Sequence, residues 1–193
     1  CSSELAQVSH DGRDRLNAIP GVEASAFTCC LPLEGGYGLP FNILGRAPEG
    51  KSPWNGGAGW MSASPGYFSV FRIPILSGRD FTQQDTGSAP LVALINETMA
   101  KKYWPKSSPV GQQILIGKGV GPQFTEGPRQ IVGVVGDIRD GGLNRDPRPL
   151  MIVPIAQVTD GMTALNSNIG PMVWLVRTHG DPPLPVQAEQ ARH

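Results

Sequence analysis

The sequence carries no excess of charge of either sign. Sixteen lysines and arginines balance sixteen aspartates and glutamates, so the formal net charge is zero. A protein that binds nucleic acid through its phosphates, or docks on anionic lipid, usually presents a basic surface. The charge balance therefore argues against nucleic acid and against an anionic membrane surface as partners.

Long hydrophobic runs are also missing. The longest apolar runs cover residues 91–95, 131–135 and 172–176, which is the length of a strand and far below the ~18 residues of a membrane span. The first four residues are polar, where a signal peptide would have its apolar segment. Composition leaves open whether the chain is a mature protein, a cytosolic protein or a piece of a larger one.

Cysteine is scarce, and two of the three cysteines are adjacent: the chain has Cys1, Cys29 and Cys30. An odd count that includes neighbours does not build a disulfide framework. Free thiols that pack as small hydrophobes in a strand are therefore expected at Cys29 and Cys30. Cys1 followed by two serines resembles the start of a lipidated lipoprotein, although an arbitrary chain boundary is the preferred interpretation.

Histidine is equally scarce, and no pair of its three histidines has the spacing of a zinc site. One loop offers oxygen atoms that could bind calcium, from Asp137, Asp140, Asn144 and Asp146. It lacks the alternating acidic pattern and final glutamate of an EF-hand, and three arginines lie among its carboxylates. Ion pairs within the loop are predicted in place of a metal site.

Motifs for phosphate binding and nucleophilic catalysis fail on spacing. Five residues separate Gly111 from Gly117, where a phosphate-binding loop has four, and no serine or threonine follows Lys118. A Gly-x-Ser-x-Gly elbow is absent. No catalytic, metal-binding or cofactor-binding residue is therefore assigned, and no cofactor is expected.

One enzymatic alternative stays open, because carboxylates can meet in a fold without any sequence motif. This alternative is a secreted or periplasmic hydrolase whose site is assembled only in the fold. It predicts a deep cleft that brings Asp80, Asp137 or Asp146 close to His10 or His179.

Glycine and proline are abundant, with 25 and 19 residues, and they make the chain rich in loops. Tyr37 and Trp54 lie in two such Gly/Pro-rich segments. An exposed aromatic side chain in a loop often contacts a partner. These two residues are the candidate partner-contact residues.

Strands alternate with short helices along the chain, which indicates an α+β protein with mixed sheets. Helices are predicted over residues 3–19, over a short segment that Ser64 caps and Pro65 opens, and over 97–104, which Asn96 caps. Strands are predicted over residues 22–28, 41–44, 60–63, 73–76, 90–95, 112–116, 129–138, 151–155 and 172–177. Polar stretches at 82–89 and 139–149 are placed to bracket a small inserted lobe.

Several short segments, in a consistent order along nearly the whole chain, together resemble one known family. They are residues 19–23 (IPGVE), 31–33 (LPL), 64–68 (SPGYF), 73–81 (IPILSGRDF), 93–97 (ALINE), 103–105 (YWP), 109–111 (PVG), 131–137 (IVGVVGD), 146–149 (DPRP) and 176–178 (VRT). The ordered set resembles the MacB-like periplasmic core domain of bacterial ABC-transporter permeases. It is most similar to the duplicated permeases in which FtsX-like membrane segments flank such domains.

The resemblance implies a two-lobed α+β domain on the periplasmic face of the inner membrane. Residues 1–82 and 147–193 would form a porter-like α/β lobe next to the membrane, and residues 83–146 a smaller inserted mixed α/β lobe. The implied function is that of a non-catalytic domain of an efflux or export permease, which transmits conformational change and contacts substrate or partner. The implied partners are flanking transmembrane helices of the same polypeptide, a separate ATPase subunit and periplasmic proteins.

Two features depart from the family pattern. Cys29 and Cys30 replace the small polar or alanine residues usual there, and the tail after Asp181 is proline-rich where the family runs into a helix that returns to the membrane. We therefore expect truncation before that helix is complete. The permease hypothesis also predicts that residues 3–6 and 188–193 lie on the same side of the domain.

Overall fold

The computed structural model describes residues 2–33, 36–139, 141–170 and 172–180. The expectations for Cys1, for Asp140 and for residues 188–193 fall outside these ranges. Within them, the end of the last strand lies beside the first turn of the chain, because the His179 backbone N–H donates to the Gly21 carbonyl.

Helices are short except for the first one. They are α1 (Ser2–Asn17), α2 (Tyr67–Phe71), α3 (Glu97–Tyr103) and α4 (Asp160–Ile169), with single 3-10 turns η1 (Pro122–Phe124) and η2 (Ile155–Gln157). The strands are β1 (Val22–Thr28), β2 (Gly38–Ile43), β3 (Gly56–Ala63), β4 (Ile75–Gly78), β5 (Val92–Asn96), β6 (Gln113–Ile116), β7 (Arg129–Val135), β8 (Leu150–Pro154) and β9 (Val173–Thr178).

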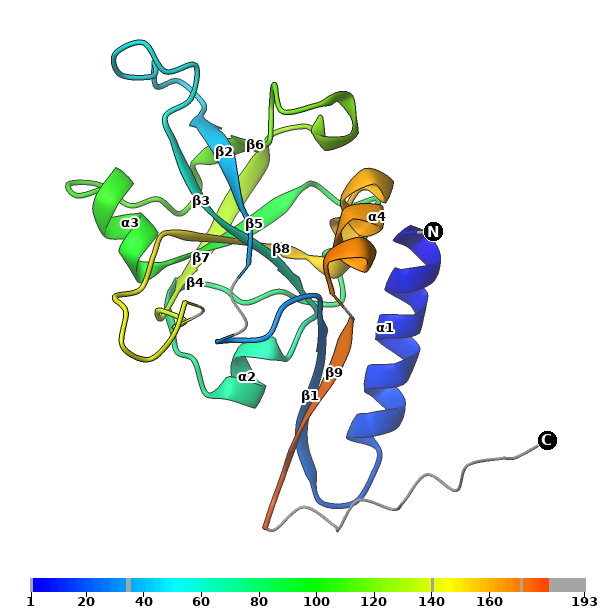
Figure 1. The fold of residues 1–193 in the computed structure, drawn as a ribbon. Helices are drawn as coiled ribbons and strands as arrows, with labels where there is room; N and C mark the ends of the chain where they lie inside the picture. Colours follow the sequence, from blue (N-terminus) through cyan, green and yellow to red (C-terminus); the bar gives the residue numbers. More distant parts are fainter. Residues whose placement is uncertain (1, 34–35, 140, 171, 181–193) are drawn as a thin grey trace.

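One mixed sheet contains all of these strands, and part of it closes on itself. The pairing order is β2-β6-β7-β5-β8-β3-β1-β9, and β2 also pairs with β3. Strands β2, β6, β7, β5, β8 and β3 therefore form a closed hydrogen-bonded ring, which we call the strand ring. It occupies the upper part of the molecule in Figure 1.

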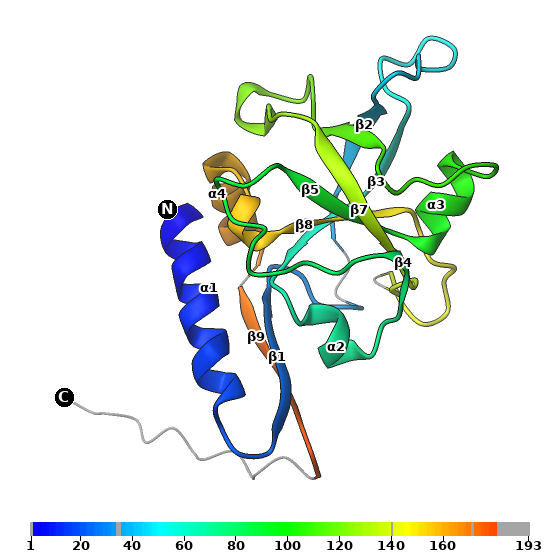
Figure 2. The same cartoon turned by 180° about the vertical axis from the view of Figure 1, so that it is seen from behind.

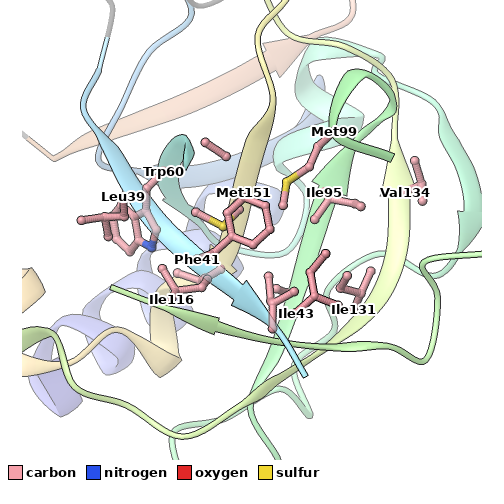
Figure 3. Packing of buried hydrophobic residues seen from close by; sticks show 14 of the residues in the cluster. Leu39, Phe41, Ile43, Trp60, Ile95, Met99, Ile116, Ile131, Val134 and Met151 are labelled. Carbon is pink, nitrogen blue, oxygen red and sulfur yellow. The ribbon is translucent and has the colours of Figure 1, made fainter. Parts of the chain in front are cut away.

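Alternate side chains of the ring strands fill its interior, as the two-residue period of a strand requires. The buried interior residues are Leu39, Phe41, Ile43, Ala58, Trp60, Ala93, Ile95, Ile114, Ile116, Ile131, Val134, Met151 and Val153 (Figure 3). The period slips once, between Ile131 and Val134. A bulge beside Gly133 accounts for the slip, since the β5–β7 register shifts there.

Gly133 is required at this bulge. A Cβ on it would lie 2.5 Å from the carbonyl oxygen of Arg79 and 2.9 Å from that of Ser77. These two carbonyl oxygens and the Leu94 Cδ2, 2.9 Å away, therefore leave no space for a side chain. The same close approach lets β4 pair with β7 outside the main strand order.

The opposite face of the ring strands packs against α2 and β1. This second core contains Met61, Leu94 and Ile152 from the ring, together with Tyr67 and Phe68 of α2. Ser64 was predicted to cap α2, and this prediction is wrong. The N-cap is Gly66 with φ 96°, and the Ser64 hydroxyl accepts a hydrogen bond from the Phe27 N–H at 2.8 Å.

Helix α1 and strands β1 and β9 form an extension beside the ring, which we call the limb. β1 and β9 are antiparallel over their whole lengths, and α1 lies along them (Figure 1). The Trp174 indole of β9 packs over Gly12 of α1, where a Cβ would overlap its outer ring atoms. The glycine predicted to weaken this helix therefore makes room for an aromatic ring.

The limb joins the ring where β1 meets β3. Thr28 pairs with Ala63, and its hydroxyl donates to the Ser62 carbonyl at 2.8 Å. Farther along, the Arg177 Nε of β9 donates to the Val70 carbonyl of α2 at 2.6 Å. Hydrogen bonds thus tie the limb to β3 of the ring and to α2, which packs against the ring.

The predicted division into lobes stays a prediction. Strands β5, β6 and β7 come from the segment assigned to the inserted lobe, residues 83–146, and they share the strand ring with β2, β3 and β8 from the flanking segments. The mixed α/β class is confirmed, whereas a two-lobed arrangement is not.

Candidate functional site

Asp137, first considered as a metal ligand, has a structural role at the N-terminus of α3. Its Oδ1 accepts from the Asn96 side chain at 2.7 Å and from the Thr98 N–H at 2.9 Å, and its Oδ2 accepts from the Thr98 hydroxyl at 2.8 Å. Asn96 also caps α3 as predicted, since its Oδ1 accepts from the Met99 N–H. In the part of the chain that the structure describes, no three or more metal-ligating side chains come together.

The cavity that His10 lines does not contain the aspartates that the hydrolase alternative requires. His10 lines a cavity of about 300 Å³ whose carboxylate is that of Asp85. None of the three aspartates proposed for catalysis lines this cavity. The His10 ring instead lies 3.4 Å from the Asp11 carboxylate on its own helix, and His179 lies exposed at the end of β9.

Asp85 accepts hydrogen bonds on both of its carboxylate oxygens. Arg79 Nη1 and Nη2 each donate to it at 2.8 Å, and the Thr82 N–H adds a third hydrogen bond at 2.8 Å. Burial alone would raise the pKa of Asp85, but these hydrogen bonds and the Arg79 charge lower it overall. The carboxylate therefore stays ionised at neutral pH.

Asp80 beside it shows the opposite shift. Burial raises the pKa of the Asp80 carboxyl, only partly offset by the Phe81 N–H, which donates to it at 2.6 Å, and by Arg79. The two aspartates thus have pKa values displaced in opposite directions. Because Asp85 is bound to Arg79 on both oxygens, we interpret the pair as structural.

Cys29 and Cys30 form a disulfide between adjacent residues, and the expectation of free thiols is wrong. The chain bends at the end of β1, and this bend brings the two sulfurs together. The Thr28 hydroxyl accepts from the Cys30 N–H at 3.3 Å and so holds the bend. Nothing in the sequence spacing distinguishes such a pair from two free thiols.

Tyr37 has intramolecular partners for both its ring and its hydroxyl. The ring stacks on Trp60 with centroids 5.6 Å apart, and the hydroxyl donates to the Asn166 Oδ1 of α4 at 2.6 Å. Burial raises the pKa of this phenol. The structure thus gives Tyr37 a role in joining α4 to the ring, and a contact with a partner stays a prediction.

Trp54 lies between two shallow surface grooves near the loop that joins β2 to β3. One groove, of about 550 Å³, is bordered by glycines of β3 and by Arg148, and the other, of about 650 Å³, is bordered by Leu44 and Lys118. The Trp54 indole N–H donates to the Lys118 carbonyl at 2.8 Å, which fixes its orientation. In both views this loop lies at the opposite end of the molecule from the turn between α1 and β1 (Figures 1 and 2).

With this geometry established, the comparisons with known proteins identify the family. The model of the MacB-like periplasmic core domain matches residues 14–187. The chain belongs to this family. No protein of the curated set matches the sequence.

Solved structures of the same kind share the fold at low sequence identity. The periplasmic region of MacB from Actinobacillus actinomycetemcomitans has a TM-score of 0.56 at 15% identity, over 91% of this chain and 67% of that one. The extracellular domain of the noncanonic ABC-type transporter YknZ from Gram-positive bacteria has a TM-score of 0.50 at 19% identity, over 89% and 73%. A domain of a putative permease from Porphyromonas gingivalis has a TM-score of 0.52 at 20% identity, over 86% and 65%.

These similarities support a MacB-like periplasmic domain of the ABC-transporter permease type. The resemblance stated from the ordered sequence segments is therefore confirmed. Among the described residues, no helix combines the length and the apolar character needed to cross a bilayer.

Proposed function

We propose that this MacB-like domain is a non-catalytic part of an ABC-type efflux or export permease, in which it transmits conformational change and contacts substrate or partner. Transmembrane helices of the same polypeptide would flank it, and a separate cytoplasmic ATPase subunit would supply the energy. The observation that carries the proposal is the family match over residues 14–187.

The connection between limb and ring supports a mechanical role. The Phe27 N–H donates to the Ser64 hydroxyl and the Ser64 N–H donates to the Phe27 carbonyl, each at 2.8 Å. Together with the bonds from Thr28 and Arg177, these contacts join the two parts through buried or half-buried groups. A displacement of α1 would therefore move the ring with it.

The loop that joins β2 to β3, which carries Trp54, would be the contact surface for a periplasmic partner protein. This loop lies far from the limb (Figure 1), and it presents an aromatic ring between two grooves. Aromatic side chains are enriched at protein interfaces. In the proposed arrangement, the limb receives movement from the membrane helices and the opposite end delivers it to a partner.

The proposal is tested in the intact permease with its ATPase, reconstituted in lipid vesicles. A version in which a short Gly/Ser linker replaces residues 22–178 should still assemble and hydrolyse ATP but fail to export. Unchanged export by that version would contradict the proposal. A reading frame without apolar segments of ~20 residues on either side of this domain would contradict it as well.

The Trp54 contact is tested separately. Trp54→Ala should reduce export in the intact permease without changing its ATPase activity in detergent. Trp54→Phe, which keeps an aromatic ring at the same position, serves as the control and should retain export. Equal export by Trp54→Ala and the parent would exclude Trp54 from partner contact.

The inserted lobe at residues 83–146 is also kept as a proposal. Hydrogen exchange would test it, because two lobes that open independently protect their amides to different extents. Equal protection in β5 and β3, which belong to different proposed lobes, would show instead that the ring opens as one unit.

A further inference from the structure

We infer that the cavity between α1 and the segment from Thr82 to Gly87 binds a small anion with a hydrocarbon part, such as an alkyl or aryl carboxylate. The cavity measures about 300 Å³, which is at the lower end of the range for small-molecule sites. Figure 2 shows the segment between β4 and β5 turning beside the N-terminal half of α1. The site lies on the limb side of the molecule and is separate from the Trp54 grooves.

One face of α1 supplies the polar part of this cavity. Ala6, Ser9, His10 and Arg13 follow helical spacing and all line it. Ser9 and Arg13 are only 4% and 8% exposed. Polar side chains that are buried at a cavity wall need hydrogen-bond partners.

Arg13 is the group that selects the ligand's charge. Its side chain is 9% exposed and, within the described residues, pairs only with Asp14 through a single 3.2 Å contact from Nη2. A guanidinium carries five N–H donors. Most of these donors therefore have no acceptor in the described part of the protein, and the residue lines the cavity.

The other charged group in the cavity does not compete for Arg13. Both oxygens of Asp85 are occupied, by Arg79 and by Thr82. The Arg79–Asp85 pair is close to neutral. Arg13 therefore supplies the positive charge that lines the cavity, because its partner Asp14 is not among the lining residues. A carboxylate matches an arginine fork with two parallel hydrogen bonds.

Part of the remaining wall is apolar and limits the shape of the ligand. Pro65, Pro154, Ile155 and Ala156 form this apolar part of the lining. Ile155 is 1% exposed and is the first residue of η2, directly after β8. An anion with a short hydrocarbon part would place its carboxylate at Arg13 and its apolar end against this wall.

The test uses octanoate as the probe and the 193-residue chain, followed by NMR shifts of backbone amides. Octanoate should give saturable shifts at residues 6–13 and 82–87, whereas 1-octanol, which lacks the charge, should bind at least about tenfold more weakly. Equal affinity for the two probes, or no saturable shift with octanoate, would overturn the inference.

Matched variants locate the charge. Arg13→Gln should weaken octanoate binding by about tenfold or more, and Arg13→Lys by less. Arg15→Gln, an exposed arginine on the same helix, should leave binding unchanged. If Arg13→Gln fails to fold, Ala6→Phe decides, because its ring would fill the cavity from α1 and abolish binding. Binding that survives in Ala6→Phe, or in a folded Arg13→Gln, would contradict the proposed site.

Discussion

The Arg129 guanidinium and the Glu126 carboxylate form an ion pair through two parallel hydrogen bonds, 2.6 Å from Nε and 2.7 Å from Nη2. The arginine side chain is 1% exposed. Its remaining donors reach the Val92 carbonyl and both the backbone and side-chain oxygens of Gln157. One side chain therefore connects β7, β5 and η2.

Replacing this arginine should be costly even when the charge is kept. Arg129→Lys keeps the positive charge but replaces the five directed N–H donors of the guanidinium with a single ammonium group. The carbonyl oxygens of Val92 and Gln157 then lose their hydrogen-bond donors. We expect the free energy of unfolding to fall by about 3 kcal/mol, measured by urea denaturation. Arg145→Lys, at an exposed position, should change it by less than about 0.5 kcal/mol. Equal stability of the two variants would contradict this.

Gly12→Ala should destabilise the protein, although alanine is the better helix former by about 1 kcal/mol. The added methyl group would overlap the Trp174 ring, so the ring must move and lose its contact with Phe27, now 4.6 Å between centroids. A loss of about 1–3 kcal/mol is expected. The same substitution in a Trp174→Ala background should instead be neutral or stabilising. A double-mutant cycle by thermal denaturation measures this coupling, and additive effects would argue against the contact.

Acid should weaken the fold through Asp85. Its pKa is lowered from 3.8 in the folded state, so the stabilisation is present above that value and is lost as the pH falls through the lower folded pKa. Between about pH 5 and pH 2, Asp85→Asn should therefore lose stability less steeply than the parent.

Asp80 should affect the pH dependence of stability in the opposite direction. Burial raises the pKa of Asp80 in the folded protein. The stability that its protonated carboxyl contributes is therefore complete below the pKa of the unfolded chain, and it is lost as the pH rises through the pKa of the folded protein. Asp80→Asn should thus gain relative stability as the pH rises through that raised pKa. Urea midpoints measured across the acid range for both variants would show the two slopes, and parallel curves would contradict the assignment.

Cys29 and Cys30 should resist alkylation in the oxidised protein. In a Cys1→Ser background, denatured protein should react with maleimide only after reduction, because the two sulfurs are bonded to each other. Cys29→Ala in the same background should leave Cys30 reactive without reductant. Labelling of both cysteines before reduction would show that the thiols are free.

Local signals in the sequence predicted the elements whose structure depends on neighbouring residues. The bounds of β1 match the alternation of residues 22–28, and Asn96 caps α3 as expected, because a cap needs only a side chain three residues before its donor. Helix α4, which precedes β9, was not predicted from the sequence. Glycine, threonine and two asparagines give it low helix propensity, and packing of Met162 and Leu165 against the ring interior stabilises it instead.

The parts that could not be predicted depend on contacts between distant segments. Strand periodicity indicates that Leu39 and Phe41 share a face, but not that this face closes into a ring with Ile116 and Met151. The cavity beside Arg13 likewise needs α1 to meet a segment about seventy residues later. Tyr37 and Trp54 were proposed as contact residues from their loop composition, and this role stays a prediction. Their intramolecular partners Asn166 and Lys118 had no signal in the sequence.

The closed strand ring sets the order in which this chain can reach its final form during synthesis. Strand β8 pairs with both β3 and β5, so the ring stays open until residue 154 has emerged into the compartment where the domain folds. Until then the apolar faces of β2 and β3 have no complete enclosure, although both strands emerge early. Chaperones that bind unfolded chains would therefore bind this domain in the interval between the emergence of β3 and that of β8.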